Sequence, residues 1–378
     1  MLYKNLVQII RKYDKNVKVV LIKVNHAYFS KLDFEPYRKY FDQTIEFDFI
    51  HYKKNLFRGW QEIFNFQKRI KDINTAFMSG FERIDLFLDD SAYLPVNILL
   101  YNLSRQKNVK NIVKFSFGGL EGLQTKTDKI RTFLCALYSL PFKSYKIRVL
   151  NNLEGQFINF SYSEDTPGII VKIISPTADL LSGFGYPKEN VLPYPIAFKY
   201  SPSAKKDMVI VFGKGKSFQN NPKYFSDYET YIKKLTAFFK VLENKYSDCR
   251  LFYKSFPLDE GQIMPGIDIK KYSLLDDTAD AQELLDKYQQ RIKAVYSPLS
   301  AIAVHSSFFG IPSYTFFRYL CSQAGIEKFN SLMNKDILRS EFLFHISNLS
   351  EIGKIDNLER PIMDFKKLEE IYRKILYV

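Results

Sequence analysis

Short apolar segments alternate with amphipathic segments in two series along this chain of 378 residues. The clearest apolar segment, 208–212, reads MVIVF and is followed by a turn and by a helix-like segment over 226–245. A strand without polar positions is typical of a parallel sheet whose two faces are both covered by helices. The alternation therefore predicts an α/β protein with parallel sheets.

The two series are separated by a segment rich in Pro, Gly and Asn, residues 151–203. A chain of this length is too long for one typical domain and suits two. We therefore predict an N-terminal domain over 1–150, a connection over 151–203 and a C-terminal domain over 204–378. Both domains are expected to be Rossmann-like doubly wound sheets that face a central cleft, with ligands at the carboxyl ends of the strands.

The individual elements follow from the same periodicities. An opening helix is expected over 3–11, before the first strand. Strands are expected over 17–24, 43–50, 84–88, 112–117, 156–160, 169–174, 208–212, 250–254 and 294–296. Further helices are expected over 60–73, 96–106, 126–139, 226–245, 281–289 and 365–376.

The chain carries a formal net charge of +14, and a basic surface attracts the phosphate groups of nucleic acids, anionic lipids or nucleotides. Its basic residues are scattered in pairs with no long run, so no nucleic-acid partner is expected. Peripheral contact with an anionic membrane is expected instead, at the inner face of the plasma membrane. Neither a membrane-spanning segment nor a signal peptide is predicted, because no apolar window is long enough.

The cysteines and histidines of the chain argue against a disulfide framework and against a metal site. Cys135, Cys249 and Cys321 are far apart and odd in number, which favours a reducing cytoplasm over a disulfide framework. The four histidines show no metal-ligand spacing. We therefore expect neither a metal site nor a cofactor.

Glycines and lysines follow the predicted strand 208–212 directly, as Gly213-Lys214-Gly215-Lys216. Glycine lets the backbone approach a phosphate, and lysine supplies positive charge. The spacing is that of neither a P-loop nor a dinucleotide-binding motif, so a plain surface turn is an equal alternative. Lys254 ends the next predicted strand, where it either closes that strand or adds charge to a ligand site.

Serines cluster after the strand 294–296, in the sequence YSPLSAIAVHSSFFGIPSY. Ser297 and Ser300 stand at a strand end and a helix start, where hydroxyls either cap the helix or bind an anion. Capping explains one serine more easily than two. His305, Ser306 and Ser307 lie further into the helix, and we expect them to serve packing and capping.

Carboxylates follow two strands of the first series. Asp90 stands in Asp89-Asp90-Ser91, where helix capping is the main alternative to a catalytic role. Glu121 stands in the glycine-rich segment GGLEG. A carboxylate at a strand end is a candidate general base that activates a hydroxyl group.

These motifs resemble those of GT-B glycosyltransferases, and more narrowly of the bacterial sialyltransferase-like enzymes that extend lipooligosaccharide or capsule. Those enzymes have an acidic-Gly motif, a strand ending in a glycine turn, a Lys-Pro-His-Pro-like segment and a Ser-rich segment before a small apolar helix. The corresponding positions occur here in the same order, as Leu120-Glu121-Gly122, Val211-Phe212-Gly213, Tyr253-Lys254-Ser255-Phe256-Pro257 and Ser297-Pro298-Leu299-Ser300.

The resemblance implies an inverting, metal-independent transferase. Its donor would be a nucleotide-activated sugar, with CMP-sialic acid or a related CMP-linked acidic sugar as the candidate, and its acceptor a glycan or lipid-linked glycan. Glu121 would take the proton from the acceptor hydroxyl, with Asp90 as the alternative base. The nucleotide would be held by Gly213, Lys214, Lys216, Lys254, Ser297 and Ser300.

Two departures from the family pattern affect the donor. The segment 254–257 has no histidine, and Ala301 stands where a second serine is usual. Both weaken the assignment of CMP-sialic acid more than that of a nucleotide-sugar transferase. A polyol-phosphate or Kdo transferase of the same fold and a non-catalytic protein of a polysaccharide complex are therefore kept as alternatives.

Overall fold

The chain forms two compact units. A computed structural model describes residues 2–25, 33–48, 56–76, 78–88, 99, 102–103, 106–115, 148–152, 156–159, 170–175, 191–199, 206–332 and 343–377. The C-terminal unit consists of Met1–Lys18, Lys31–Asp42 and Pro195–Leu368, and the N-terminal unit of Val19–Ser30, Gln43–Tyr194 and Glu369–Val378.

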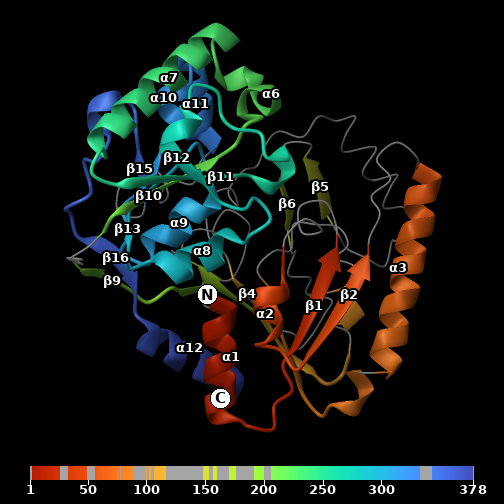
Figure 1. The fold of residues 1–378 in the computed structure, drawn as a ribbon. Helices are drawn as coiled ribbons and strands as arrows, with labels where there is room; N and C mark the ends of the chain where they lie inside the picture. The colour runs from red at the N-terminus through yellow and green to blue at the C-terminus, as the bar shows by residue number, and fades with distance from the viewer. Residues whose placement is uncertain are drawn as a thin grey trace. The chain divides into compact units, whose positions relative to one another are not determined.

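A six-stranded parallel sheet forms the centre of the C-terminal unit, in the order β12-β11-β10-β13-β14-β15 (Figure 1). Every residue of β10 is buried, which agrees with its unbroken apolar sequence. The strands are β10 (Met208–Gly213), β11 (Arg250–Ser255), β12 (Tyr272–Leu274), β13 (Ile292–Ser297), β14 (Ser313–Thr315) and β15 (Phe344–His345).

Helices cover both faces of this sheet. α7 (Tyr228–Lys245) lies on one face, where the Phe238 ring is 6.1 Å from that of Tyr296. α8 (Ala281–Tyr288) and α9 (Ala301–Ser307) lie on the other, and their side chains share a core with β10 and β13. The start of α7 is fixed by Asp227, whose carboxylate accepts a hydrogen bond from the Thr230 amide at 2.7 Å. We refer to these as the α7 face and the α8/α9 face.

Two segments from the start of the chain belong to the C-terminal unit. α1 (Leu2–Tyr13) is amphipathic, and its Lys4 Nζ lies 3.0 Å from Asp286 Oδ2 of α8. In α2 (Glu35–Arg38), the Tyr37 hydroxyl donates to Asp280 Oδ2 at 2.5 Å. The remaining elements of this unit are β9 (Ile196–Lys199), α6 (Ser217–Asn220), α10 (Phe317–Leu320), α11 (Gln323–Leu332), β16 (Arg360–Met363) and the start of α12 (Phe365–Tyr377).

The N-terminal unit contains parallel pairing as well. β1 (Val20–Asn25) pairs with β2 (Gln43–Asp48), and a separate four-stranded sheet has the order β3-β4-β7-β8. The latter strands are β3 (Ile84–Leu88), β4 (Val109–Phe115), β7 (Ile170–Ser175) and β8 (Val191–Pro193), and β5 (Arg148–Asn152) and β6 (Gln156–Asn159) form an antiparallel pair. The long helix α3 (Leu56–Ala76) buries Ile63, Phe66 and Ile70 in a core with Val24 and Phe47.

The last turns of α12 pack in this same unit. Tyr372 is fully buried, with its ring 6.1 Å from that of Phe115 in β4. The Asn111 side chain donates to the Ile375 carbonyl at 3.1 Å. The C-terminal helix therefore starts in one compact unit and ends in the other.

The predicted α/β class with Rossmann-like parallel sheets is confirmed, and most predicted strands lie within two residues of those observed. The helices expected over 126–139 and across most of 96–106 fall outside the described residues. The domain boundaries at 150 and 203 stay predictions; the compact units differ from them by being discontinuous in sequence. Among the described helices, none is long and apolar enough to cross a bilayer.

Candidate functional site

The strand order of the C-terminal sheet defines where a ligand site is expected. In chain order its strands run 3-2-1-4-5-6, which is the classical dinucleotide-binding arrangement. The order reverses between β10 and β13, and ligands of such sheets bind outside the carboxyl ends of the strands at this point. Gly213 ends β10 and Ser297 ends β13, so the predicted segments 213–216 and 297–300 flank the reversal.

The packing of the protein itself requires the glycine that ends β10 and the one in the turn that follows. A Cβ atom on Gly213 would lie 2.0 Å from the Tyr253 hydroxyl oxygen, and one on Gly215 would lie 2.6 Å from the Gln262 carbonyl oxygen. Both contacts are far below van der Waals distance. The structure thus gives these glycines a reason that does not involve a phosphate.

The lysines of this turn lie near a buried carboxylate. The Lys214 ammonium is 5.1 Å from the centre of the Phe256 ring, and burial lowers its pKa while Asp259 opposes the shift. The Asp259 side chain also accepts a hydrogen bond from the Lys216 amide at 3.4 Å. The turn therefore brings two lysines to the sheet edge, where the Asp259 carboxylate balances part of their positive charge.

Lys254 has a structural contact. Its side chain is 2% exposed and donates to the Asp277 carbonyl at 2.9 Å. Burial lowers the pKa of this lysine, whereas nearby carboxylates, with Asp277 first, raise it. Lys254 connects the end of β11 to the loop that follows β12.

Most of the hydroxyls around α9 are satisfied inside the protein. Ser300 caps α9 and accepts from the Ile302 amide at 3.4 Å. Ser306 donates to the Ala303 carbonyl at 3.0 Å and lies 2.7 Å from the Ser313 hydroxyl. Ser307 donates to the Val304 carbonyl at 2.7 Å. These contacts agree with the packing and capping roles expected for Ser306 and Ser307.

His305 is also set in the protein interior. Its side chain is buried, and desolvation lowers its pKa to about 3. The imidazole is therefore neutral at physiological pH, so His305 carries no charge that could hold an anion.

Ser297 differs from the other serines. It is fully buried, and its hydroxyl has no hydrogen-bond partner within the part of the chain that the structure describes. Val295, two residues earlier, packs in the core with α8 and α9, so the alternation of a strand directs Ser297 toward the same face. The strand end at the reversal point thus carries a buried, unpaired hydroxyl on the α8/α9 face.

Two further polar residues stand in register with Ser297 across the sheet. Thr315 of β14 pairs with Ser297, and His345 of β15 pairs with Thr315. The Thr315 hydroxyl and His345 Nδ1 are 2.7 Å apart, and both side chains are buried. Neighbouring strands lie about 4.8 Å apart, so the three residues form a continuous row at the carboxyl edge. We call Ser297, Thr315 and His345 the polar row.

Sequence reasoning did not select Thr315 or His345. Thr315 ends a three-residue strand after the Gly-Ile-Pro turn, which was a usable signal for a strand end. β15 has only two residues, too few for any periodicity, so the position of His345 beside Thr315 arises only from long-range pairing.

On the α7 face of the same strand ends, four polar side chains form a hydrogen-bonded network. The Tyr246 hydroxyl lies 2.7 Å from that of Tyr296 and donates to Asp356 at 2.8 Å. Tyr314 donates to the same carboxylate at 2.6 Å, and its ring stacks on Tyr296 with the centroids 4.5 Å apart. Burial raises the pKa of Asp356, against the hydrogen bonds from the two tyrosines.

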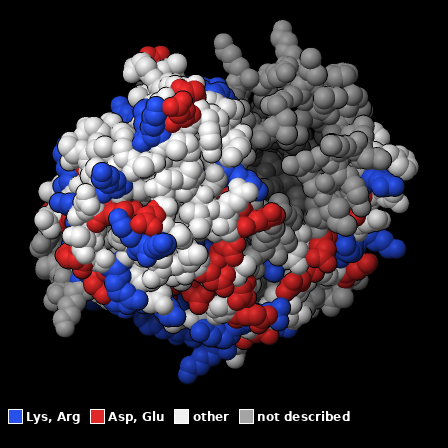
Figure 2. Space-filling view, turned by 45° about the horizontal axis from the view of Figure 1, so that its top comes forward, with Lys and Arg blue, Asp and Glu red and all other residues white. Residues whose placement is uncertain are grey.

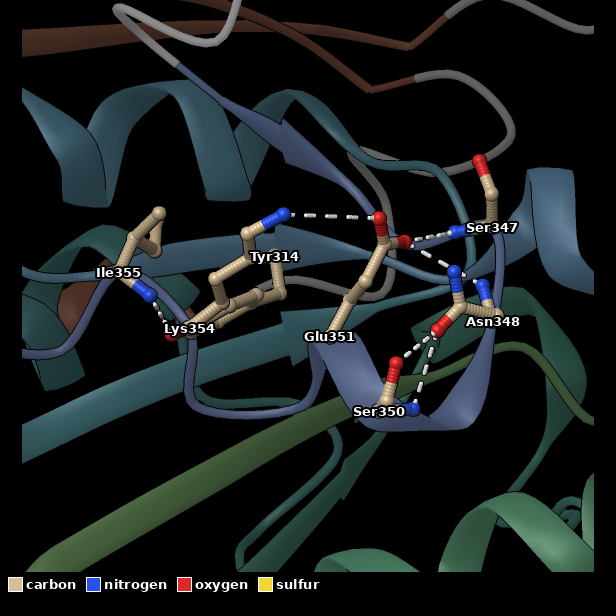
Figure 3. Close-up of polar contacts among 7 residues, drawn as sticks. All are labelled: Tyr314, Ser347, Asn348, Ser350, Glu351, Lys354 and Ile355. Atoms are coloured by element: carbon tan, nitrogen blue, oxygen red, sulfur yellow. Dashed lines mark hydrogen bonds and ion pairs between the residues drawn. The ribbon is translucent and has the colours of Figure 1, made fainter.

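The segment that follows β15 is held in place beside this network. Figure 3 shows the Ile355 amide donating to the Tyr314 hydroxyl, at 2.9 Å. It also shows Glu351 accepting from the amides of Ser347 and Asn348, at 2.7 and 3.2 Å. The second of these bonds belongs to a capping box between Asn348 and Glu351. Local capping and the tyrosine network therefore fix this segment together.

The two predicted catalytic carboxylates, Asp90 and Glu121, lie outside the described residues. Within the described residues, no group of three or more His, Cys, Asp or Glu is placed to hold a metal ion. Figure 2 shows basic and acidic side chains side by side over the described surface of one face, with acidic groups gathered near the middle of the view.

Comparison with known proteins gives structural neighbours only. The S. aureus MnaA–UDP structure is 11% identical over 92% of this chain and 90% of its own, with a TM-score of 0.43. The wall teichoic acid polymerase TagF is 12% identical over 98% and 78%, with a TM-score of 0.45. The GT-B domain of a Photobacterium damselae sialyltransferase is 10% identical over 90% and 96%, with a TM-score of 0.43.

No protein-family model matches the chain, and no curated protein sequence matches it. The three structural neighbours named above have TM-scores below 0.5 and identities of 12% or less. The comparisons therefore assign no family to this protein.

Proposed function

We propose that this protein is a glycosyltransferase of the GT-B type that binds a nucleotide-activated sugar at the carboxyl edge of its six-stranded sheet. It would transfer the sugar to a hydroxyl of a surface glycan or lipid-linked glycan. A CMP-linked acidic sugar is the candidate donor. The motif order in the sequence and the position of the reversal point support the proposal.

The unpaired hydroxyl of Ser297 is the observation that carries this proposal. A buried hydroxyl without a partner costs about 1 to 3 kcal/mol, and native proteins rarely keep one without a reason. A phosphate oxygen is a strong acceptor that would satisfy it. Because Ser297 is fully covered in this structure, donor binding must also displace the side chains that cover it.

The lysines supply the charge that such a donor needs. Lys214 and Lys216 follow β10, next to β13, where the diphosphate or monophosphate of a donor would lie. Their positive charge would oppose the negative charge that grows on the departing nucleotide. Asp259 lies beside them, so the lysines would bind the donor with part of their charge already balanced.

The transfer itself requires a base on the acceptor side. The acceptor oxygen would form a bond to the anomeric carbon, the bond from that carbon to the phosphate oxygen would break, and the acceptor proton would pass to a carboxylate. Glu121 is the proposed base, and Asp90 the alternative. Inversion of configuration and independence of metal follow from the resemblance alone.

A thermal-shift screen with CMP, CDP, UDP and GDP tests the donor site. A nucleotide that binds only the folded protein at 100 times its Kd should stabilise it by about 2.7 kcal/mol. We expect one of the four to do so, and we expect Ser297→Ala to lose most of that gain. Ser307→Ala is the matched control, because its hydroxyl is buried and already bonded. No shift with any nucleotide would contradict the proposal.

A donor assay separates the enzymatic alternatives. Release of CMP from CMP-sialic acid in the presence of a glycan acceptor supports the sialyltransferase form, whereas activity only with a polyol-phosphate or Kdo donor supports the first alternative. Glu121→Gln should abolish turnover and leave nucleotide binding unchanged. Nucleotide binding without turnover for any donor would support the non-catalytic alternative.

A further inference from the structure

Helix α3 carries two exposed phenylalanines on the side that faces away from its buried core. Ile63, Phe66 and Ile70 are buried in the core of the N-terminal unit. Phe57 and Phe64 are nevertheless 74% and 50% exposed. In Figure 1 no described element of the N-terminal unit lies on the side of α3 opposite to β1 and β2. The outward face of a helix in a soluble protein is usually polar, so these two phenylalanines need an explanation.

The exposed phenylalanines share one line along the helix with two lysines. Phe57, Phe64, Lys68 and Lys71 are spaced by seven, four and three residues, which places them on the same side of an α-helix. Both lysines are exposed. We call these four residues the outer stripe of α3.

α3 carries two acidic residues, Glu62 and Asp72. Glu62 is largely covered and forms an ion pair with Arg69 at 3.1 Å. Asp72 is exposed next to Lys71. At the other end, Arg58 adds a further exposed basic residue beside Phe57. The outward side of α3 is therefore both aromatic and basic.

This combination matches the chemistry of an anionic lipid surface. Helices that lie on a membrane insert aromatic side chains at the boundary between headgroups and acyl chains and direct lysines to the lipid phosphates. A protein partner fits less well, because protein interfaces are depleted in lysine at their core and bury about 800 Å² on each side. Two phenylalanines separated by Gln61 provide no continuous apolar patch of that kind.

We propose that the outer stripe of α3 binds the surface of an anionic bilayer, with Phe57 and Phe64 inserted and Lys68 and Lys71 against the headgroup phosphates. The net charge of +14 on the whole chain would add attraction at longer range. The proposal is independent of the donor site, because the stripe belongs to the N-terminal unit and needs no nucleotide to bind lipid.

Vesicle flotation of the full chain tests this proposal. Vesicles of phosphatidylcholine alone are compared with vesicles that also contain phosphatidylglycerol. We expect binding only to the second kind, and weaker binding at high salt. F57S/F64S should weaken it about tenfold or more. K68Q/K71Q should weaken it about 30-fold, since each lysine near an anionic surface contributes about a factor of five.

The control is L274S/L358S, which removes two apolar residues that are 58% and 54% exposed in the C-terminal unit. It should bind vesicles like the wild type, and all three variants should melt like the wild type because the altered side chains are exposed. Equal binding to both kinds of vesicle, or unchanged binding by F57S/F64S, would overturn the proposal. So would a dimer in gel filtration that is lost in F57S/F64S, which would assign the stripe to a second copy of the chain.

Discussion

Tyr296 and Ser297 are neighbours in β13, and they point to opposite faces of the same sheet. On the α7 face, the Tyr296 hydroxyl belongs to a network with Tyr246, Tyr314 and Asp356 in which each polar group has a partner. On the α8/α9 face, the Ser297 hydroxyl has none among the described residues. One step along the backbone thus separates a hydroxyl that the protein bonds from one that, under the proposed function, a donor phosphate would bond.

The difference between the two faces separates polar side chains that folding explains from those that are candidates for binding a ligand. A polar side chain whose hydrogen bonds are all internal is explained by folding, and Ser300, Ser306, Ser307 and Lys254 belong to this group. A buried polar atom that is left unpaired carries a free-energy cost that folding alone does not recover. By this criterion Ser297 is the strongest of the predicted nucleotide-binding residues.

The largest effect is expected from breaking the network on the α7 face. Asp356→Ala removes the acceptor of hydrogen bonds from Tyr246 and Tyr314 and leaves both buried hydroxyls short of a partner. We expect the free energy of unfolding to fall by about 3 kcal/mol. Urea denaturation measures this loss, and a loss below about 1 kcal/mol would show that the network is not what stabilises this face.

A smaller loss is expected when the glycine that ends β10 is filled. Gly213→Ala places a methyl group against the buried Tyr253 ring, and overpacking of this kind costs about 2 kcal/mol. Gly261→Ala is the matched control, because its φ is +77° but the space around it is open, so we expect only about 1 kcal/mol. If the two variants were equally stable, packing against Tyr253 would not explain Gly213, and a role in the ligand site would be the better explanation.

Asp356 should also give the α7 face a pH dependence. Its folded-state pKa is raised by burial, so the folded protein binds the proton more tightly than the unfolded chain. The stability that this carboxyl contributes is present below its ordinary pKa and is lost as the pH rises through the raised value. The advantage of the wild type over Asp356→Asn should therefore shrink as the pH is raised from acid. An advantage that grows with pH would mean that the tyrosine hydrogen bonds outweigh burial.

Ser306→Ala is expected to have a modest effect on the α8/α9 face. It removes hydrogen bonds to the Ala303 carbonyl and the Ser313 hydroxyl, while Ser313 keeps its bond to Ile311. We expect a loss of about 1 kcal/mol in chemical denaturation, with no change in nucleotide binding. If this variant lost nucleotide binding, the nucleotide site would extend from Ser297 into α9.

Much of the fold could be predicted because its signals are local. The unbroken apolar sequence of β10 and the acidic cap before α7 each determine an element within a few residues. The division of the chain into compact units was harder to predict from the sequence, because α1 packs against α8 through a contact between Lys4 and Asp286. Nothing in the sequence near either residue indicates that pairing.

The candidate site was predictable only in part, for the same reason. Ser297 could be found because strand-end serines are visible in the sequence, but only the structure shows that its hydroxyl has no partner in the described part of the chain. Gly213 shows the reverse case, because a glycine that accommodates Tyr253 and one that accommodates a phosphate look identical in sequence. Asp356 lies 42 and 110 residues from the tyrosines that it bonds, beyond the reach of any local pattern.

Ser297→Ala, examined by denaturation and by nucleotide binding together, tests the central claim most directly. Because the hydroxyl is buried and has no partner among the described residues, its removal should leave the free energy of unfolding unchanged or slightly raised, by about 1 kcal/mol at most. The same change should remove most of the stabilisation that the preferred nucleotide gives to the wild type. A variant that loses more than about 1 kcal/mol of stability and still binds nucleotide normally would make Ser297 a structural residue and contradict the account.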